Sequence, residues 1–195
     1  MARTRTFDEA DTLDRAMRAF WERGYKGTSL DQLLSATGLS KSSLYASFGD
    51  KRTLLLRALE RYGDWLARGP AAPLMDDEAA RPAIEAFFRR SLDNAAGPNG
   101  QHGCLANNCA AEAAPHDPAI RQATLALVER IELALQRAVV RGQADGSIQR
   151  RESPEALARF LFNTVSGLNV AARAQPGPDR LADIVRVALS ALDPP

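Results

Sequence analysis

Lysine is scarce in this chain of 195 residues, where it occurs only at Lys26, Lys41 and Lys51. Long apolar runs are missing too. No stretch approaches the roughly 18 apolar residues of a membrane-spanning helix, and the first residues lack the apolar segment of a secretory signal. These absences favour a cytoplasmic protein without a membrane partner. Its two cysteines, Cys104 and Cys109, are then expected to be reduced.

Alternating apolar and polar residues, which are typical of β-strands, are also absent, and apolar residues recur at helical spacing instead. Leu13, Met17, Phe20 and Trp21 share one face of a first helix that ends near Gly24. Further helices are predicted at 30–37, 41–48, 51–66, 81–95, 103–114, 118–144, 154–173 and 179–192, and a loop at 68–82. The sequence therefore predicts an all-α protein of about nine helices.

Two of these predicted helices are short and joined by a tight turn. Ser29 and Gln32 form a capping-box pattern at the start of the first, and Gly38 can adopt the left-handed backbone that a sharp turn needs. In the second helix Leu44 and Phe48 point inward. The outward residues are Lys41, Ser42, Ser43, Tyr45 and Ser47. This is the pattern of a helix-turn-helix that binds DNA in the major groove, although a purely structural corner between helices fits it as well.

One ordered set of residues resembles the TetR/AcrR-type transcriptional regulators. It comprises Phe20, Gly24, Tyr25, Thr28, Ser29, Leu33, Gly38, Leu39, Ser40, Lys41, Leu44, Tyr45, Phe48, Lys51, Leu54 and Leu55. The resemblance implies a helix-turn-helix DNA-binding domain over residues 1–52 and an effector-binding and dimerisation domain over residues 53–195. The net charge of +1 argues only mildly against this interpretation, because a local basic face is enough to bind phosphate.

The resemblance also implies roles for single residues in binding double-stranded DNA. Thr28 and Ser29 would contact phosphate at the start of the second helix, and Tyr45 and Lys51 would each bind a further phosphate. The groove would be contacted by Lys41, Ser42 and Ser43.

Arg3 and Arg5 could reach the DNA from the N-terminal arm, although a solvated tail is the alternative. Leu34 departs from the small residue common in the family.

In such regulators the last two long helices pair with those of a second subunit. Here these helices are 154–173 and 179–192. Their apolar stripes are formed by Leu157, Phe160, Leu161, Val165 and Leu168, and by Leu181, Ile184, Val185 and Ala188. The resemblance therefore implies a homodimer, whose symmetry would match a palindromic operator. The alternative is that these stripes pack inside one subunit.

The run Gly103-Cys104-Leu105 opens another predicted helix and is similar to one branch of the family, in which the cysteine of some members reacts with oxidants or electrophiles. A helix N-terminus favours a reactive thiolate at Cys104, whereas the alternative is a small buried side chain. An intrachain bridge to Cys109 would require Cys104 to lie off the helix or the helix to break, because Cα atoms five residues apart on a helix are about 8.6 Å apart. The cysteines and histidines match no standard zinc spacing, so we expect no metal site and no cofactor.

The candidate effector-binding residues are an apolar set with few polar groups: Trp65, Phe87, Phe88, Cys104, Leu105, Asn108, Leu125, Phe160 and Phe162. The sequence thus predicts a homodimeric repressor that a small apolar or aromatic effector, or modification of Cys104, releases from its operator. One alternative is a non-DNA interaction module that retains the fold. An enzyme is disfavoured, because we find no nucleophile–base spacing and no phosphate-binding loop.

Overall fold

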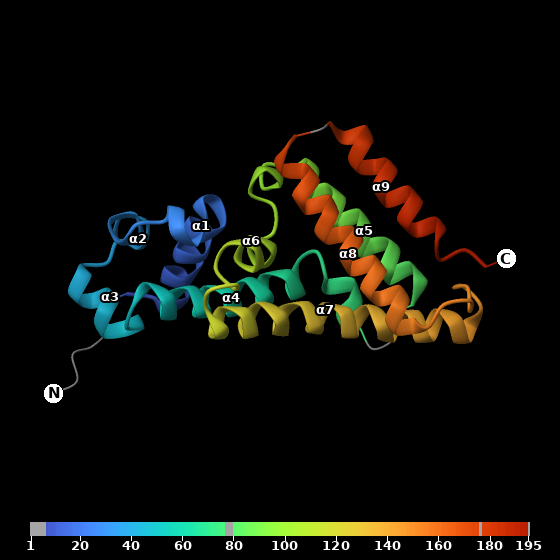
Figure 1. Cartoon of the computed structure of the whole chain (residues 1–195), viewed down its shortest axis with the longest axis horizontal. Helices are drawn as coiled ribbons and strands as arrows, with labels where there is room; N and C mark the ends of the chain where they lie inside the picture. Colours follow the sequence, from blue (N-terminus) through green and yellow to red (C-terminus); the bar gives the residue numbers. More distant parts are fainter. Residues whose placement is uncertain (1–6, 77–79, 176, 195) are drawn as a thin grey trace. The chain divides into compact units, whose positions relative to one another are not determined.

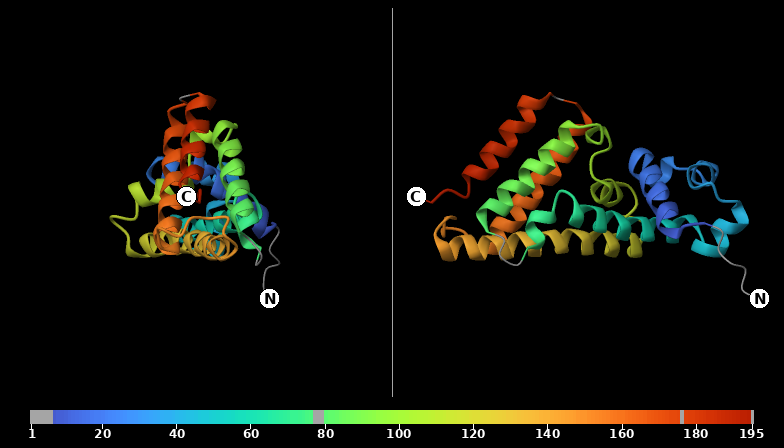
Figure 2. Two further views of the ribbon diagram at one scale, coloured as in Figure 1. Left: turned by 90° about the vertical axis from the view of Figure 1, so that its right-hand side faces the viewer. Right: turned by 180° about the vertical axis from the view of Figure 1, so that it is seen from behind.

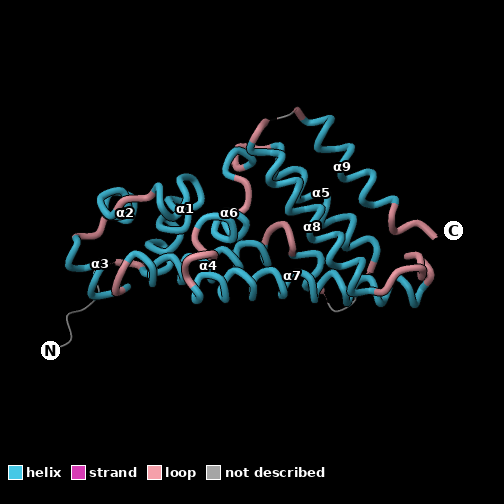
Figure 3. The backbone as a smooth tube through the Cα atoms, viewed as in Figure 1, coloured by secondary structure: helices cyan, strands magenta, loops and turns pink. Residues whose placement is uncertain are grey.

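The computed structural model describes residues 7–76, 80–175 and 177–194, which form nine α-helices and two short 3-10 helices with no strand among them (Figures 1 and 3). The α-helices are α1 (Glu9–Gly27), α2 (Leu30–Thr37), α3 (Lys41–Phe48), α4 (Lys51–Arg68), α5 (Arg81–Ala96), α6 (Leu105–Glu112), α7 (Pro118–Asp145), α8 (Pro154–Arg173) and α9 (Pro178–Ser190). This confirms the predicted all-α fold. Every helix in the described ranges is too short or too polar to cross a lipid bilayer.

The helix boundaries differ from the predicted ones in three places. The first helix runs on to Gly27, with non-helical backbone at Gly24 inside it. The stretch 68–82, predicted as a loop, contains the 3-10 helix η1 (Ala72–Met75), because Leu74 turns inward and is 3% exposed. A second 3-10 helix, η2 (Gly100–His102), precedes α6, which therefore begins at Leu105 rather than at residue 103. Arg3 and Arg5 lie outside the described residues.

Contacts between Cα atoms divide the chain into two units. Unit 1 comprises Met1–Asp64 and Leu105–Thr124, and unit 2 comprises Trp65–Cys104 and Leu125–Pro195. The segment 105–124, which the sequence-based division at 52/53 assigns to the second domain, thus has its contacts with the first. The division of roles between 1–52 and 53–195 stays a prediction.

The core of unit 1 is built from α1 to α4 together with the 105–124 segment. Phe20, Leu33 and Leu44 are each 0% exposed, and full burial of such a side chain stabilises a fold by about 1.5–3 kcal/mol. The rings of Trp21 and Tyr62 meet edge to face, with centroids 5.2 Å apart. Because α1, α2, α3 and α4 each contribute buried side chains, the short helices α2 and α3 are held by packing rather than by their own length.

In unit 2 the helices α5, α8 and α9 lie side by side, as two further views also show (Figure 2). Their shared core contains Phe88, Leu161 and Leu181, which are at most 3% exposed. On α8 and α9 the predicted apolar stripes mainly serve this core, since Leu157 and Leu168 are also buried. Most of the stripe expected at a dimer interface therefore packs within one subunit.

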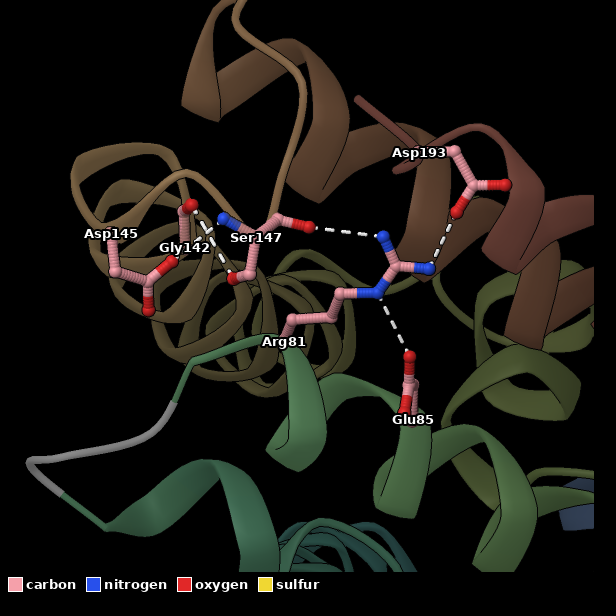
Figure 4. A network of polar contacts seen from close by, with 6 residues as sticks. All are labelled: Arg81, Glu85, Gly142, Asp145, Ser147 and Asp193. Atoms are coloured by element: carbon pink, nitrogen blue, oxygen red, sulfur yellow. Dashed lines mark hydrogen bonds and ion pairs between the residues drawn. The ribbon is translucent and has the colours of Figure 1, made fainter. Parts of the chain in front are cut away.

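Arg81, the first residue of α5, joins three segments of unit 2 (Figure 4). Its guanidinium donates to Glu85 Oε1 at 2.9 Å, to the carbonyl oxygen of Ser147 at 3.0 Å and to Asp193 Oδ1 at 2.6 Å. The hydrogen bond to Glu85, and then that to Asp193, raise the pKa of Arg81. Ser147 N–H in turn donates to Asp145 Oδ1 at 2.8 Å. The connection between α7 and α8 and the chain segment after α9 are thereby fastened to α5.

Candidate nucleic-acid interface

The first helix of the predicted helix-turn-helix, α2, is capped at both ends. Ser29 Oγ accepts from Gln32 N–H at 3.2 Å, and Gln32 Oε1 accepts from Ser29 N–H at 2.7 Å, which confirms the capping box. At the other end Gly38 takes the left-handed conformation, with φ 71° and ψ 12°, and donates its N–H to the carbonyl oxygen of Leu34. The side chain of Leu34 is itself half-buried. The turn that the sequence predicted is therefore present.

The second helix, α3, has an inner and an outer face. Ser40 caps it by accepting from Ser43 N–H at 3.2 Å, and the buried side chains of Leu44 and Phe48, 0% and 2% exposed, attach it to the core. The outer face presents Lys41 and Ser42, which are exposed, and Tyr45, whose exposure is 45% although it is a large ring. Ser43 and Ser47 are half-buried beside them. A helix fixed from one side with lysine and hydroxyl groups on the other suits contact with bases and phosphates.

Lys51, the first residue of α4, lies beside the aromatic ring of Tyr25. Its Nζ is 4.5 Å from the ring centroid, a cation–π arrangement. Burial lowers the pKa of Lys51, and the nearby carboxylate of Glu112 opposes that effect. Burial also raises the pKa of Tyr25, with a further contribution from Asp117. Lys51 is thus held in a defined place at the start of α4.

Thr28 does not lie where the resemblance implied. Its side chain is 0% exposed, and Oγ1 donates to the carbonyl oxygens of Gly24 at 2.6 Å and Ala19 at 3.3 Å. The hydroxyl is therefore bonded to the carbonyls of α1 and is shielded from solvent. Ser29, the next residue, is exposed, so at the start of α2 only Ser29 of this pair stays a candidate for contact with DNA.

Two carboxylates of the 105–124 segment contact α1 and α4, and no sequence pattern predicts either contact. Glu112 accepts from the backbone N–H groups of Tyr25 and Lys26 at 2.9 and 2.7 Å. Asp117 accepts two hydrogen bonds from the guanidinium of Arg52, with Nη2 2.9 Å from Oδ1. Their partners are 65 to 87 residues away along the chain, which is beyond the reach of motif and periodicity arguments.

The predicted effector residues do not share one environment. Phe87 and Phe88 are buried in the core of unit 2, where their rings meet edge to face at 5.8 Å, and Leu105 is buried in unit 1. Leu125 and Phe160 are 52% and 45% exposed, so the structure places them at the surface rather than around an enclosed cavity. The partly buried members of the set are Trp65, Cys104, Asn108 and Phe162.

Two hollows in unit 2 offer space for a small molecule. One, of about 380 Å³, is lined by Ala95, Ala96, Gly97, Pro98, Gln101, Ala172, Gln175, Gly177, Pro178 and Leu181. The other, of about 480 Å³, is lined by Gln149, Arg151, Glu152, Ala156, Leu157, Phe160 and Ala191. Phe160 is the one predicted effector residue that lines either of these two hollows.

The two cysteines are not joined in a disulfide: Cys104 is partly exposed and Cys109 is buried. Cys104 lies off the helix, directly before α6 begins. No group of three or more His, Cys, Asp or Glu side chains in the described ranges is arranged to hold a metal ion.

Comparison with family models assigns both parts of the chain. Residues 13–58 match the bacterial regulatory proteins of the tetR family, and residues 80–188 match the tetracyclin repressor-like C-terminal domain. The HTH-type transcriptional regulator YezE of Bacillus subtilis (strain 168) is 33% identical over 99% of this chain and 100% of its own. The HTH-type transcriptional repressor ComR of Escherichia coli (strain K12) is 30% identical over 96% of this chain and 90% of its own.

Solved structures share the fold over nearly the whole chain. A cysteine mutant of the TetR family transcriptional regulator CifR, complexed with a 26-base-pair double-stranded operator DNA, superimposes with a TM-score of 0.85 at 33% identity and covers 97% of this chain and 99% of its own. The reduced form of NemR from Escherichia coli has a TM-score of 0.81 at 22% identity, over 95% of this chain and 98% of its own. The second likeness concerns the fold alone.

Proposed function

Because this chain belongs to the TetR family of DNA-binding transcriptional regulators, we propose that it is a homodimeric repressor of a palindromic DNA operator. Members of the family are regulators rather than enzymes. The outer face of α3 carries the proposal, since its buried residues fix the helix while Lys41, Ser42 and Tyr45 face outward. Operator DNA in the CifR complex and the repressor activity named for ComR support the same assignment.

The proposed contacts divide into two kinds. Lys41, Ser42 and Ser43 lie in the first turn of α3, the part of a recognition helix that approaches base edges. Ser29, Tyr45 and Lys51 would bind phosphate and so position the helix without reading sequence. Ser47 is half-buried in the last turn of α3 and would support the groove contact.

A second copy of the chain would pack against the outer faces of α8 and α9. Phe160, Val170 and Val187 are exposed there by 45%, 61% and 57%, and Gly167 has open space where a side chain would stand. Exposed large apolar side chains favour burial against a partner. A twofold dimer would present two copies of α3 to two half-sites one helical turn apart.

Release from the operator would follow either a small apolar or aromatic effector or modification of Cys104. The 380 Å³ hollow between the end of α5 and the start of α9 has a mainly apolar lining and is large enough for a small ligand. Cys104 is partly exposed and directly precedes the first residue of α6. Either event lowers DNA affinity only if it favours the form of the protein that binds DNA less well.

Binding to DNA fragments of the source genome tests the proposed function. We expect the purified protein to select a palindromic site, with an affinity that falls steeply as salt rises. Lys41→Ala should weaken binding, and Glu129→Gln, on the exposed face of α7, should not. A protein that selects no site, or binds without salt dependence, would instead be a non-DNA interaction module with the same fold.

Treatment of the DNA complex with an oxidant or a quinone tests the role of Cys104. If its thiol is the sensor, the wild type should release the operator and Cys104→Ala should retain it. Equal release by both would leave the small-molecule effector as the one proposed signal.

A further inference from the structure

The backbone around Gly24 interrupts α1 in an unusual way. Gly24 has φ 76° and ψ 170°, a region that essentially only glycine occupies. The N–H groups of the next two residues, Tyr25 and Lys26, both donate to the carboxylate of Glu112, one to each oxygen. One carboxylate therefore caps the short turn that follows the kink, as an anion caps a helix N-terminus.

This turn lies against the start of α2. The carbonyl oxygen of Gly24 accepts from the hydroxyl of Thr28 at 2.6 Å, and Thr28 directly precedes Ser29, the N-cap of α2. The turn is thus bound at its amides by Glu112 and at its carbonyl by Thr28. A displacement of Glu112 would change the place of Ser29.

The same turn carries the ring against which Lys51 packs. Tyr25 stacks its ring near that of Phe20, with centroids 6.2 Å apart, and the ammonium of Lys51 lies 4.5 Å from the Tyr25 ring centroid. Glu112 also attracts that ammonium directly. All of these residues belong to unit 1, so the arrangement is internal to one compact unit.

We propose that Glu112 is a positioning residue for DNA binding, which holds the Gly24–Lys26 turn so that Tyr25 presents Lys51 to the DNA backbone. The proposal rests on the phosphate contact of Lys51 in the proposed function. It assigns the last residue of α6 to DNA binding through the two backbone amides from which its oxygens accept.

Removal of the Glu112 charge should change operator affinity in opposite directions for a positioning role and for simple charge repulsion. Loss of a negative charge near DNA should strengthen binding, because the carboxylate repels the phosphates. Loss of a positioning carboxylate should weaken it. Glutamine at position 112 keeps the shape of the side chain but offers one acceptor and one NH₂ donor, so it can satisfy only one of the two amides.

The experiment measures operator affinity, at several salt concentrations, for Glu112→Gln, Lys51→Ala and the double variant. We expect Glu112→Gln to weaken binding about tenfold, and less than about twofold in a Lys51→Ala background, because residues that act through one contact are not additive. Faster hydrogen exchange at the Tyr25 and Lys26 amides should accompany the loss. Glu60→Gln, an equal charge change on the exposed face of α4, is the control and should leave binding unchanged or tighter.

Each outcome decides between the proposals. If Lys51→Ala weakens binding and Glu112→Gln does not, or if their effects simply add, the positioning role is overturned and the phosphate contact stands. If Lys51→Ala leaves both affinity and salt dependence unchanged, the phosphate contact itself is wrong and the positioning role falls with it. Should Glu112→Gln unfold, Glu112→Asp keeps the charge on a shorter side chain and should bind with intermediate affinity; wild-type affinity for it would overturn the proposal.

Discussion

Arg52 and Asp117 form a two-bonded ion pair across 65 residues of sequence. Asp117 also accepts from the N–H groups of Ala119 and Ile120 at 2.9 and 3.2 Å, so the same carboxylate caps α7. The hydrogen bond from Arg52, and then those from the backbone, lower the pKa of Asp117 to about 2. One side chain thereby ties the first turn of α4 to the start of α7.

Asp117→Asn should reduce the acid sensitivity of the protein. A carboxyl whose pKa falls from about 3.9 in the unfolded chain to about 2 in the folded one stabilises the fold above about pH 4. That stabilisation is lost as the pH falls towards 2. The urea midpoint of the wild type should exceed that of the variant near neutral pH, and the two should converge between about pH 4 and 2.

A suitable control is Asp183→Asn. Asp183 pairs with Arg186, but their side chains are 68% and 71% exposed, and such a pair contributes little. Its stability curve should follow that of the wild type. Parallel curves for the wild type and Asp117→Asn would show that the ion pair does not set the acid limit.

Thr28→Val should reduce stability without removing a DNA contact. The variant keeps the shape of the side chain but loses the hydrogen bonds to Gly24 and Ala19, at a cost of about 0.5–1.5 kcal/mol for each bond. The salt dependence of operator binding should not change. A slope reduced by about 1 would indicate a lost phosphate contact and contradict the burial of Thr28.

Gly24→Ala should destabilise the chain and weaken DNA binding. At φ 76° a side chain is strained, and its Cβ would stand 2.7 Å from Glu112 Oε2, so we expect a cost of about 1–3 kcal/mol in thermal or urea unfolding. Gly27→Ala is the matched control. There the nearest atom is Arg23 Cβ at 3.8 Å and the backbone is helical, so alanine should be neutral or slightly stabilising. Equal effects at both positions would argue against a special role for Gly24.

Val170→Asp should convert a dimer into a monomer. Val170 is 61% exposed on α8, so aspartate leaves the subunit folded but would place a charge inside the proposed interface. Sedimentation should show the loss of the dimer, and binding to the full palindrome should fall. Leu133→Asp makes the same change on another helix, α7, where Leu133 is 46% exposed. A dimer that survives Val170→Asp would exclude this surface as the interface.

Local features were predictable because they depend on residues within about four positions of each other. The capping box of Ser29 and Gln32 and the left-handed Gly38 both lie where the pattern predicts. The ordered family residues then indicated that α2 and α3 form a DNA-binding helix-turn-helix. Roles taken from the resemblance were less secure for single side chains, as the buried hydroxyl of Thr28 shows.

The apolar stripes of α8 and α9 are visible in the sequence, but their division between the core and the surface is not. Leu157 and Leu161 are buried, whereas Phe160, between Leu157 and Leu161 in the sequence, is 45% exposed. All three residues are apolar, so residue type alone does not show which of them is buried. The packing of α5 against both helices decides which side is covered, and with it which residues are available to a second subunit.

By itself, then, the sequence determined the helices, their caps and the identity of the DNA-binding segment, because hydrogen bonds within a helix and its turns are made between near neighbours in the chain. Only the tertiary structure brought Glu112 to the amides of Tyr25 and Lys26, and Asp117 to Arg52. These contacts join residues that are far apart in the sequence, so no local pattern predicts them. The position of Lys51 therefore depends on how α6 packs against α1.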